Sequence, residues 1–297
     1  MEHKPGCGTT RRWGCPPPTP GSSGKVTAVD DGDPQYVRLS YGRCCYRRWG
    51  PRGKAAILLL HATADSSAGW SRVARALAAR HTVYAPDLRG HGMSARPAPG
   101  RYRIGTVADD VRAFIDAVGL FTPVVVGHSW GAAIALTLAG GRHPPPLRGL
   151  VLEELPARIS PETHPEHVRS LQAAAALDHD DVRELVALRH PQWHPDDVRS
   201  LADGLDMADA QTVHSVVADG AHAGCLPPLL QHLTVPCLLL RADPTLGTAL
   251  DDTAWEEARR RLSAGGAALR IPGASHDIHR SRFEEFVRVV EEFIASL

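Results

Sequence analysis

The sequence predicts an α/β protein built on a mostly parallel sheet of about eight strands with helices on both faces. Two patterns support this fold class. Short apolar runs, typical of strands buried on both faces, alternate along the chain with stretches whose apolar residues recur every three or four positions, as in amphipathic helices. Strands that alternate with helices form parallel sheets, because each crossover helix packs back onto the sheet. With 297 residues, the chain can bury a core of that size.

The strands are expected in chain order from a hairpin onward. Residues 37–41 and 44–48 alternate around Gly42, which predicts an edge hairpin. Continuous apolar runs then predict buried strands at residues 56–60, 82–85, 124–126, 150–152, 237–240 and 268–271.

Helices are expected between these strands. Apolar residues recur at intervals of three and four from Val107 to Val118, so one face of a helix there is apolar. Similar spacing predicts further helices around residues 73–78, 132–136, 255–262 and 283–293.

The strand pattern stops between residues 156 and 233. This stretch holds helix-like runs and no β-rich run; the helix-like runs are 168–177, 182–188 and 198–207. An all-helical insertion after one strand of a parallel sheet is typical of a cap over the site, so we expect a helical cap at 156–233. The core would then comprise residues 34–155 and 234–297. Residues 1–33 are rich in Gly, Pro, Ser and Thr without periodicity, which predicts a disordered N-terminal extension.

Composition and charge exclude several classes of partner. The formal net charge is +0 and the pI is about 7.3, so no basic stripe indicates nucleic acid. No apolar run has the roughly 18 residues of a membrane span. The six cysteines contain no C-x-x-C pair, which is typical of reduced thiols rather than of a disulfide framework. We therefore expect a cytoplasmic protein with a small-molecule substrate, no nucleic acid or membrane partner and no cofactor; the sequence leaves its oligomeric state open.

The segment Gly127-His128-Ser129-Trp130-Gly131 stands between an expected strand and an expected helix. A serine at the tip of a sharp strand-to-helix turn has a strained backbone, and the residues two before and two after it are forced together. Gly127 and Gly131 meet that need for small residues. This layout is typical of a nucleophile elbow, in which a helix N-terminus directs unpaired N–H groups at the reaction centre.

Four segments resemble the α/β-hydrolase superfamily across about residues 36–297, and they follow one another along the chain in the order found in that family. Besides the elbow, they are the loop Leu60-His61-Ala62-Thr63, the turn Asp87-Leu88-Arg89-Gly90-His91-Gly92-Met93-Ser94 and the loop Ile271-Pro272-Gly273-Ala274-Ser275-His276. The resemblance implies an α/β-hydrolase fold in which a serine, a histidine and an acid act together.

The resemblance implies that Ser129 is the nucleophile and His276 the general base. A hydroxyl is a weak nucleophile at neutral pH and needs a nearby imidazole to take its proton. The Pro-Gly turn before His276 delivers it to the sheet edge at which the elbow lies, and His279 is the alternative histidine. The oxyanion hole would consist of the backbone N–H groups of Trp130 and Thr63.

The acid has two candidates. In the family it usually follows the strand expected at 237–240, but that position falls on Thr245, and Asp243 lies two residues earlier. In some members, such as the haloalkane dehalogenases, the acid follows the preceding strand, and Glu154 occupies that position here. Glu153 would face the other side of the sheet by alternation. We favour Glu154 and keep Asp243 as the alternative.

Three further residues are candidates for substrate binding: His61 in the loop after its strand, His128 in the elbow and Trp193 in the expected cap. The cap is also rich in histidine and aspartate, but no pair has the H-E-x-x-H frame and prolines interrupt the helical register. We therefore expect no metal site, and interpret these residues as solvated helix starts capped by aspartate; the histidines are His164, His167, His179, His190 and His194.

The identity of the expected nucleophile limits which reactions of the superfamily this chain could catalyse. Epoxide hydrolases and haloalkane dehalogenases of this superfamily attack with aspartate, whereas this chain has Ser129. Carbon–carbon bond hydrolases tend to have tryptophan after the catalytic histidine, where this chain has Asp277. The sequence thus predicts a serine hydrolase that acts on an ester, lactone or thioester of a small to medium apolar acyl substrate through an acyl-enzyme on Ser129. The alternatives are a non-hydrolytic or carbon–carbon bond-cleaving biosynthetic enzyme with the same site, and a catalytically dead ligand-binding member.

Overall fold

The computed structural model describes residues 30–159, 169, 173–174, 177–263 and 265–297. The extension expected at residues 1–33 lies outside the described residues up to position 29. The next residues are already paired, because β1 (Asp30–Asp31) lies antiparallel to β3 (Gly42–Gly50). Paired structure therefore begins before residue 34, the expected start of the core.

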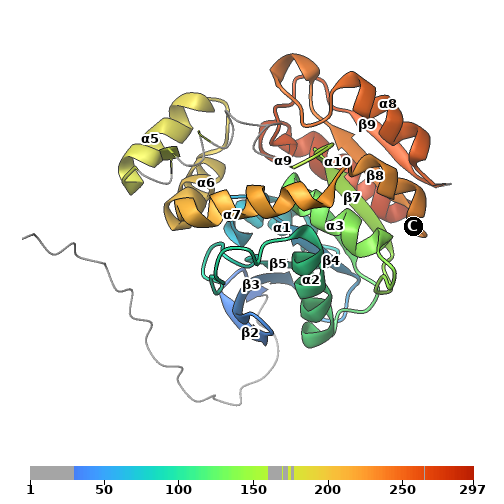
Figure 1. Cartoon of the computed structure of the whole chain (residues 1–297), viewed down its shortest axis with the longest axis horizontal. Coiled ribbons are helices and arrows are strands. Elements are labelled where there is room, and N and C mark those ends of the chain that lie inside the picture. Colours follow the sequence, from blue (N-terminus) through green and yellow to red (C-terminus); the bar gives the residue numbers. More distant parts are fainter. Residues whose placement is uncertain (1–29, 160–168, 170–172, 175–176, 264) are drawn as a thin grey trace, which may run out of the picture.

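One mixed sheet forms the centre of the molecule (Figure 1). Its described strands lie in the order β1-β3-β5-β4-β6-β7-β8-β9, with β2 paired to β3. Strands β4 to β9 are parallel to one another, whereas β1, β2 and β5 are antiparallel to β3. The remaining bounds are β2 (Gln35–Leu39), β4 (Ala56–Leu60), β5 (Thr82–Pro86), β6 (Val124–His128), β7 (Gly149–Glu153), β8 (Cys237–Arg241) and β9 (Ala267–Arg270). The mostly parallel sheet that the sequence predicts is confirmed.

The buried strands lie close to their expected positions, because their apolar runs pack between helices on both faces of the sheet; every residue of β5, β6, β7 and β8 is buried. The hairpin differs from the prediction. Strand β2 ends at Leu39, which pairs with Gly42, so Ser40 and Tyr41 form the turn. Gly42 has a φ of 130°, which glycine adopts without strain, and β3 therefore starts directly after this tight turn.

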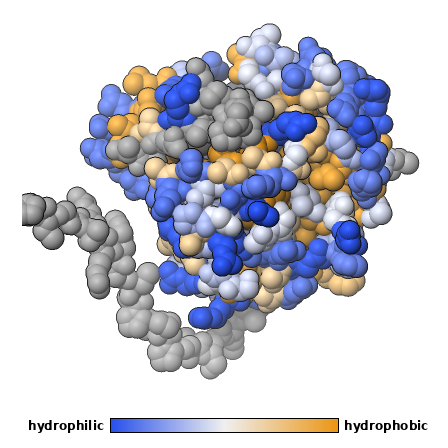
Figure 2. Space-filling view, in the orientation of Figure 1, coloured by the Kyte–Doolittle hydropathy of each residue, from blue (hydrophilic) through white to orange (hydrophobic). Residues whose placement is uncertain are grey.

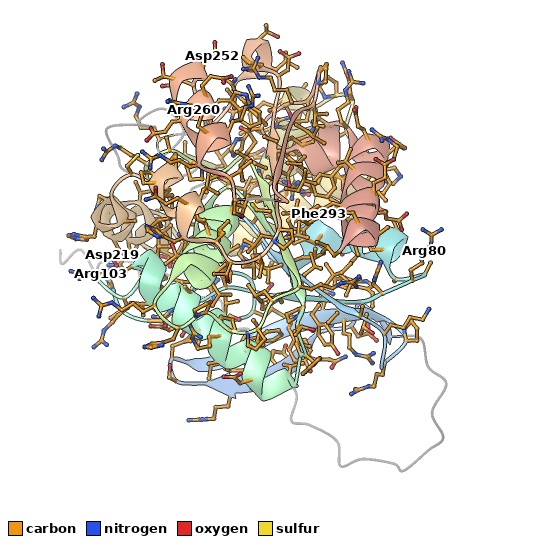
Figure 3. All side chains as sticks on the ribbon, turned by 90° about the vertical axis from the view of Figure 1, so that its right-hand side faces the viewer. Arg80, Arg103, Asp219, Asp252, Arg260 and Phe293 are labelled. Carbon is orange, nitrogen blue, oxygen red and sulfur yellow. The ribbon has the colours of Figure 1, made fainter. Side chains whose placement is uncertain are left out.

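Helices cover both faces of the sheet, as predicted. One face carries α1 (Ser71–Leu77) and α10 (Phe283–Ser296), and the other carries α2 (Ile104–Val118), α3 (Trp130–Gly140) and α8 (Asp252–Arg261). Phe293 illustrates the packing of the first face, because it is buried on the side of α10 that meets the sheet (Figure 3). Each face thus has its own apolar cluster.

The elements that the structure describes between β7 and β8 are all helices or 3₁₀ turns. The elements are α5 (His179–Arg189), α6 (Pro195–Met207), α7 (Ala210–Gly220) and the 3₁₀ turns η2 (Ala221–Ala223) and η3 (Pro227–His232). The expected runs 182–188 and 198–207 fall in α5 and α6, whereas most of the run 168–177 lies outside the described residues. The sequence did not predict α7. Asp178 caps α5 through a hydrogen bond to a backbone N–H group, as expected for an aspartate at a helix start, and Asp209 caps the unpredicted α7 in the same way.

This helical segment is attached to the core at several points. In Figure 1, α7 crosses over the core while α5 and α6 lie to one side. Asp219 of α7 lies beside Arg103 at the start of α2 (Figure 3), and its carboxylate accepts a hydrogen bond of 2.7 Å from the backbone N–H of Tyr102. On α6, Gly204 packs against the loop after β4, since a Cβ there would lie 3.0 Å from the Cα of Asp65. The segment therefore contacts the edge of the sheet that carries the candidate site.

The face shown in Figure 2 is mainly hydrophilic, and its apolar residues form small scattered groups. None of the described helices combines the length and the apolar character that crossing a bilayer requires. The cysteines of the described chain all carry free thiols; they are Cys44, Cys45, Cys225 and Cys237.

Candidate active site

Ser129 stands alone between strand β6 and helix α3, at the tip of a sharp turn. Its φ of 52° and ψ of −111° belong to neither a strand nor a right-handed helix. Its backbone N–H donates to the carbonyl of Glu153 at 2.9 Å, and its own carbonyl accepts from Ala133 at 3.0 Å. The backbone on both sides thus fixes the strained serine, and α3 begins directly behind it.

The two glycines of the elbow are held by close backbone contacts. A Cβ on Gly127 would lie less than 3.0 Å from the backbone of Gly131, and a Cβ on Gly131 would lie less than 3.0 Å from the carbonyls of Leu60 and His61. Any side chain would therefore push α3 away from β4 and β6. This is the physical reason for the G-x-S-x-G spacing in this chain.

His276 and Glu154 meet at the carboxyl edge of the sheet. Nδ1 of His276 lies 3.0 Å from Oε2 of Glu154, within hydrogen-bond reach. The His276 side chain is 31% exposed, whereas Glu154 is buried completely. The residue next to the serine, His128, contacts the same loop: its Nε2 lies 3.1 Å from the carbonyl of His276, and the two rings are 4.9 Å apart. The elbow, the end of β7 and the loop after β9 therefore converge.

Glu154 is held as a carboxylate by four contacts. Oε1 accepts hydrogen bonds from the backbone N–H of Ala242 at 2.7 Å and the hydroxyl of Thr248 at 2.9 Å. Oε2 accepts from the backbone N–H of Ala249 at 2.7 Å and faces His276. Burial raises the pKa of Glu154, but His276 and these N–H groups outweigh burial and hold the pKa below its usual value. The charged form of this buried acid is therefore the stable one.

The pKa of His276 moves in the opposite direction. Burial lowers it, but the hydrogen bond and the charge of Glu154, with smaller effects of Asp277 and Glu153, raise it above the ordinary 6.5. The carboxylates around the ring thus favour the imidazolium, which is the form that a histidine takes after it accepts a proton.

Asp243, the alternative acid, has a different place. Its Oδ1 accepts from the backbone N–H of Thr245 at 3.0 Å and from the Thr245 hydroxyl at 2.8 Å. Its Oδ2 accepts from the backbone N–H of Gly273 at 2.8 Å. Asp243 therefore caps a short 3₁₀ turn and fixes the loop that precedes His276, while Glu154 makes the contact with the imidazole ring.

Most of the strained backbone conformations lie at the carboxyl edge of the sheet, around the candidate site. Four described residues other than glycine have a positive φ, and three of them belong to the candidate site: Ser129, Glu154 and Ala64. The fourth is Thr122. Ala64 follows Thr63, whose N–H is an expected oxyanion donor; the other expected donor, Trp130, opens α3. Such conformations cost about 1–3 kcal/mol each and cluster at functional sites, because tight packing maintains them there.

A second buried pair lies beside the first, and sequence reasoning missed it. Oε1 of Glu153 accepts from the backbone N–H of His279 at 2.9 Å and also lies 2.9 Å from its Nδ1. The His279 ring stacks on Trp70 at 4.4 Å and is buried. Adjacent glutamates thus bind two histidines that are three residues apart: Glu153 ends β7 and binds His279, and Glu154 follows with a φ of 52° and binds His276. The adjacent acids at the strand end were the signal that could have predicted this pair.

His61 and His128, two of the expected substrate-binding residues, are bound to the protein itself. Both are buried. Nδ1 of His61 lies 2.7 Å from the carbonyl of Ala62, and its Nε2 accepts from the backbone N–H of Leu88 at 2.9 Å, which fixes a neutral tautomer. Burial lowers the pKa of His128 to about 4. Both rings thus contact the loops around the candidate site.

Trp193, the third expected residue, lies between α5 and α6. It lines a cavity of about 800 Å³ on the helical segment, which is also lined by Arg183, Glu184, His190, Val198 and Arg199. Its ring stacks on His190 at 3.8 Å and is almost fully buried. Trp193 therefore anchors the connection between the two helices.

The structure gathers one group of potential metal ligands that the sequence did not single out. Ligand atoms of His128, Asp277 and His279 lie within 4.8 Å of one another. Each residue already has a protein partner: His128 contacts the carbonyl of His276, Asp277 accepts from Arg280 at 2.6 Å, and His279 is paired with Glu153. The buried guanidinium of Arg280 beside Asp277 also opposes a second cation there.

Comparisons with known proteins agree with the fold. A model of the alpha/beta hydrolase fold family matches residues 55–215. The chain is 34% identical over 184 residues to the lipase LipV of Mycobacterium tuberculosis, a match that covers 62% of this chain and 58% of the lipase. The match thus spans less than two thirds of that relative's length.

Solved structures resemble nearly the whole chain. The crystal structure of E-2-(acetamidomethylene)succinate hydrolase superposes with a TM-score of 0.76 at 24% identity and covers 89% of this chain and 100% of its own. The enol-lactonase of Burkholderia xenovorans LB400 gives a TM-score of 0.73 at 23% identity, with 88% and 100% covered. At these identities the likeness establishes a shared fold.

The contacts of Gly131 predict a specific loss of stability. In Gly131→Ala the new Cβ collides with two carbonyls, so we expect the free energy of unfolding to fall by about 1–3 kcal/mol. Gly105→Ala on α2 is the matched control, because a Cβ there meets no atom within 4 Å and alanine favours a helix. Thermal and urea unfolding measure both variants; equal stability of Gly131→Ala and the parent contradicts the prediction.

Proposed function

The chain belongs to the alpha/beta hydrolase family, and on that premise we propose that it is a serine hydrolase with Ser129 as nucleophile, His276 as general base and Glu154 as the acid. The observation that carries the proposal is the contact of 3.0 Å between Nδ1 of His276 and the buried carboxylate of Glu154. It occurs in a loop that also touches the elbow.

The proposed reaction has two halves. In the first, Oγ of Ser129 bonds to the substrate carbonyl carbon while its proton passes to Nε2 of His276. The negative charge on the carbonyl oxygen is stabilised by the backbone N–H groups of Trp130 and Thr63. The carbon–heteroatom bond then breaks, and the leaving group takes the proton from His276. In the second half, water repeats the attack on the acyl-enzyme, which yields the carboxylic acid and restores Ser129.

The surroundings of Glu154 suit this role. A carboxylate bound to Nδ1 leaves Nε2 of His276 as the nitrogen that accepts the serine proton, and it stabilises the imidazolium that follows. Its hydrogen bonds to Ala242, Thr248 and Ala249 fix its position, so that the imidazole is oriented before the substrate binds. Asp243 contributes by holding the loop at Gly273.

We propose an ester, lactone or thioester with a small to medium apolar acyl group as the substrate. Similarity to the lipase LipV and to an enol-lactonase supports carbonyl substrates of this kind. The helical segment at 156–233 would act as a cap that covers the acyl group, and its helix α6 contacts the loop after β4 at Gly204. The free thiols of the described residues are consistent with action in the reducing cytoplasm.

Covalent labelling tests the nucleophile. A fluorophosphonate probe should add to Ser129, since it reacts with an activated serine, and intact-mass spectrometry followed by peptide mapping should place the adduct there. Ser129→Ala should remain unlabelled and lose about three or more orders of magnitude in turnover of p-nitrophenyl esters, thioesters or lactones of graded chain length. An unlabelled parent would indicate a ligand-binding member without hydrolase activity, and labelling without hydrolysis would indicate another reaction at the same site.

The raised pKa of His276 sets the pH dependence. Only the neutral imidazole can accept the serine proton, so kcat/KM should rise with pH through an apparent pKa above 6.5. Rates measured from about pH 5 to pH 9 would show this limb. His276→Ala should lose activity to the same extent as Ser129→Ala. An activity that declines as pH rises through this range would refute His276 as the base.

The two acids predict different losses. Glu154→Gln keeps the shape but removes the charge, so kcat should fall by about 10²–10⁴-fold. The apparent pKa of the remaining activity should fall as well, because Glu154 raises the pKa of His276. Asp243→Asn loses one of the hydrogen bonds that the two Asp243 oxygens accept but leaves the contact between Glu154 and His276 in place, so activity should stay within about tenfold of the parent. The opposite order would assign the role to Asp243.

A further inference from the structure

Arg280 is a buried cation that bridges two loops of the proposed site. Its side chain is 1% exposed. Nη2 donates to Oδ2 of Asp65 at 2.6 Å, and Nη1 donates to Oδ1 of Asp277 at 2.6 Å. Asp65 lies two residues after Thr63, and Asp277 directly follows His276. One guanidinium thus joins the loop of a proposed oxyanion donor to the loop of the proposed base.

A third segment closes over the same side chain. The guanidinium carbon of Arg280 lies 5.3 Å from the centre of the Trp193 ring, a cation–π contact with the connection between α5 and α6. On the core side, a Cβ on Gly69 would lie less than 3.0 Å from both Nη2 of Arg280 and the carboxylate of Asp65. The ion pair of Arg280 and Asp65 is therefore enclosed by Trp193 on one side and by Gly69 on the other.

We propose that Arg280 is a positioning residue for the reaction proposed above: it holds the Thr63 loop and the His276 loop at a fixed separation, so that the oxyanion donor and the base face one carbonyl group. The inference rests on the proposed function for its effect on rate. Its structural half, the fixed separation of the two loops, can be tested without any activity.

The Thr63 loop has a strained backbone that contacts from outside the loop must stabilise. Ala64 has a φ of 61°, a left-handed conformation that costs a residue with a Cβ about 1–2 kcal/mol. The loop's own turn hydrogen bond, from the N–H of Asp65 to the carbonyl of Ala62, is long at 3.4 Å. The carboxylate of Asp65 makes stronger contacts: Oδ1 accepts from the N–H of Ser66 at 2.8 Å and Oδ2 from Arg280. The strained conformation is thus maintained through Asp65.

The two separate donors of the Arg280 guanidinium, Nη1 and Nη2, form a fork, and holding both loops depends on this geometry. A guanidinium presents separate donors to two carboxylates, whereas a lysine ammonium is a single point of charge on a flexible stem. Lysine at position 280 would preserve the positive charge among Asp65, Asp277 and the nearby Asp197, but it would not fix both loops at once. Arg280→Lys therefore separates the effect of position from the effect of charge.

The control is Arg96→Met. Arg96 follows the turn after β5, donates to the carbonyl of Met207 and forms an ion pair with Asp209 before α7, so its loss also removes contacts between the core and the helical segment. These contacts do not involve Asp65, Asp277 or Asp197. A general loosening of the protein should affect both variants, whereas a loss of loop position should affect only the Arg280 variants.

The experiment compares the parent, Arg280→Lys, Arg280→Met, Asp65→Asn and Arg96→Met by hydrogen exchange and by the rate of fluorophosphonate labelling. We expect faster amide exchange in residues 61–66 and 272–279 for the Arg280 and Asp65 variants, and parent-like exchange there for Arg96→Met. Labelling and kcat should fall about 10²-fold with little change in KM, the loss that a misplacement of about 1 Å produces. Asp65→Asn combined with Arg280→Met should cost little more than either alone.

Parent-like exchange in residues 61–66 in folded Arg280→Lys and Asp65→Asn would overturn the inference, and so would an unchanged labelling rate. Full activity of Arg280→Lys with loss in Arg280→Met would also overturn it, because charge alone would then suffice. A parent protein that does not label refutes the proposed function instead, and the exchange measurement still decides whether Arg280 holds the loops. Asp65→Asn removes the charge at one end of the bridge and leaves the contact between Arg280 and Asp277, so the test stays valid even if Arg280→Met does not fold.

Discussion

Two adjacent buried carboxylates at the carboxyl end of β7 determine how the site is assembled. Glu153 is the last residue of β7 and binds His279, and Glu154, which follows it with a φ of 52°, binds His276. A buried carboxylate without partners is very costly, so the loop that carries His276 and His279 has one favourable position. The carbonyl of Glu153 also accepts the N–H of Ser129. The end of one strand thereby connects the proposed nucleophile, base and acid.

Strained backbone conformations occur at the same carboxyl edge of the sheet as these contacts. Ser129, Glu154 and Ala64 have left-handed backbones that an isolated peptide would avoid. Each is flanked by contacts that only this backbone permits: the glycines of the elbow, the N–H groups around the Glu154 carboxylate, and the Asp65–Arg280 pair. The sheet and its two apolar clusters provide the stability that maintains these conformations. The site is consequently rigid where the proposed reaction needs fixed donors.

The sequence predicts the parts of this molecule that depend on local patterns. Apolar runs located the buried strands, and the spacing of Gly127 and Gly131 located the elbow, because both constraints act over a few residues. The helix α7 was missed, since its buried residues include polar Thr212 and Ser215 and weaken the apolar period. The Glu153–His279 pair and the Arg280 bridge join segments more than a hundred residues apart. Their existence depends on the packing of the loops, which no local pattern encodes.

The same packing balances the charges around His276. Glu154, Asp277 and Glu153 all raise its pKa, and unopposed they would keep the imidazole protonated and unable to act as a base. Two of these carboxylates have partners of their own: Arg280 binds Asp277, and His279 binds Glu153. Glu154, whose other partners are backbone N–H groups and a hydroxyl, is left as the carboxylate that acts directly on the ring. The ion pair between Arg280 and Asp277, outside the proposed reaction centre, thus offsets part of the negative charge that raises the pKa of His276.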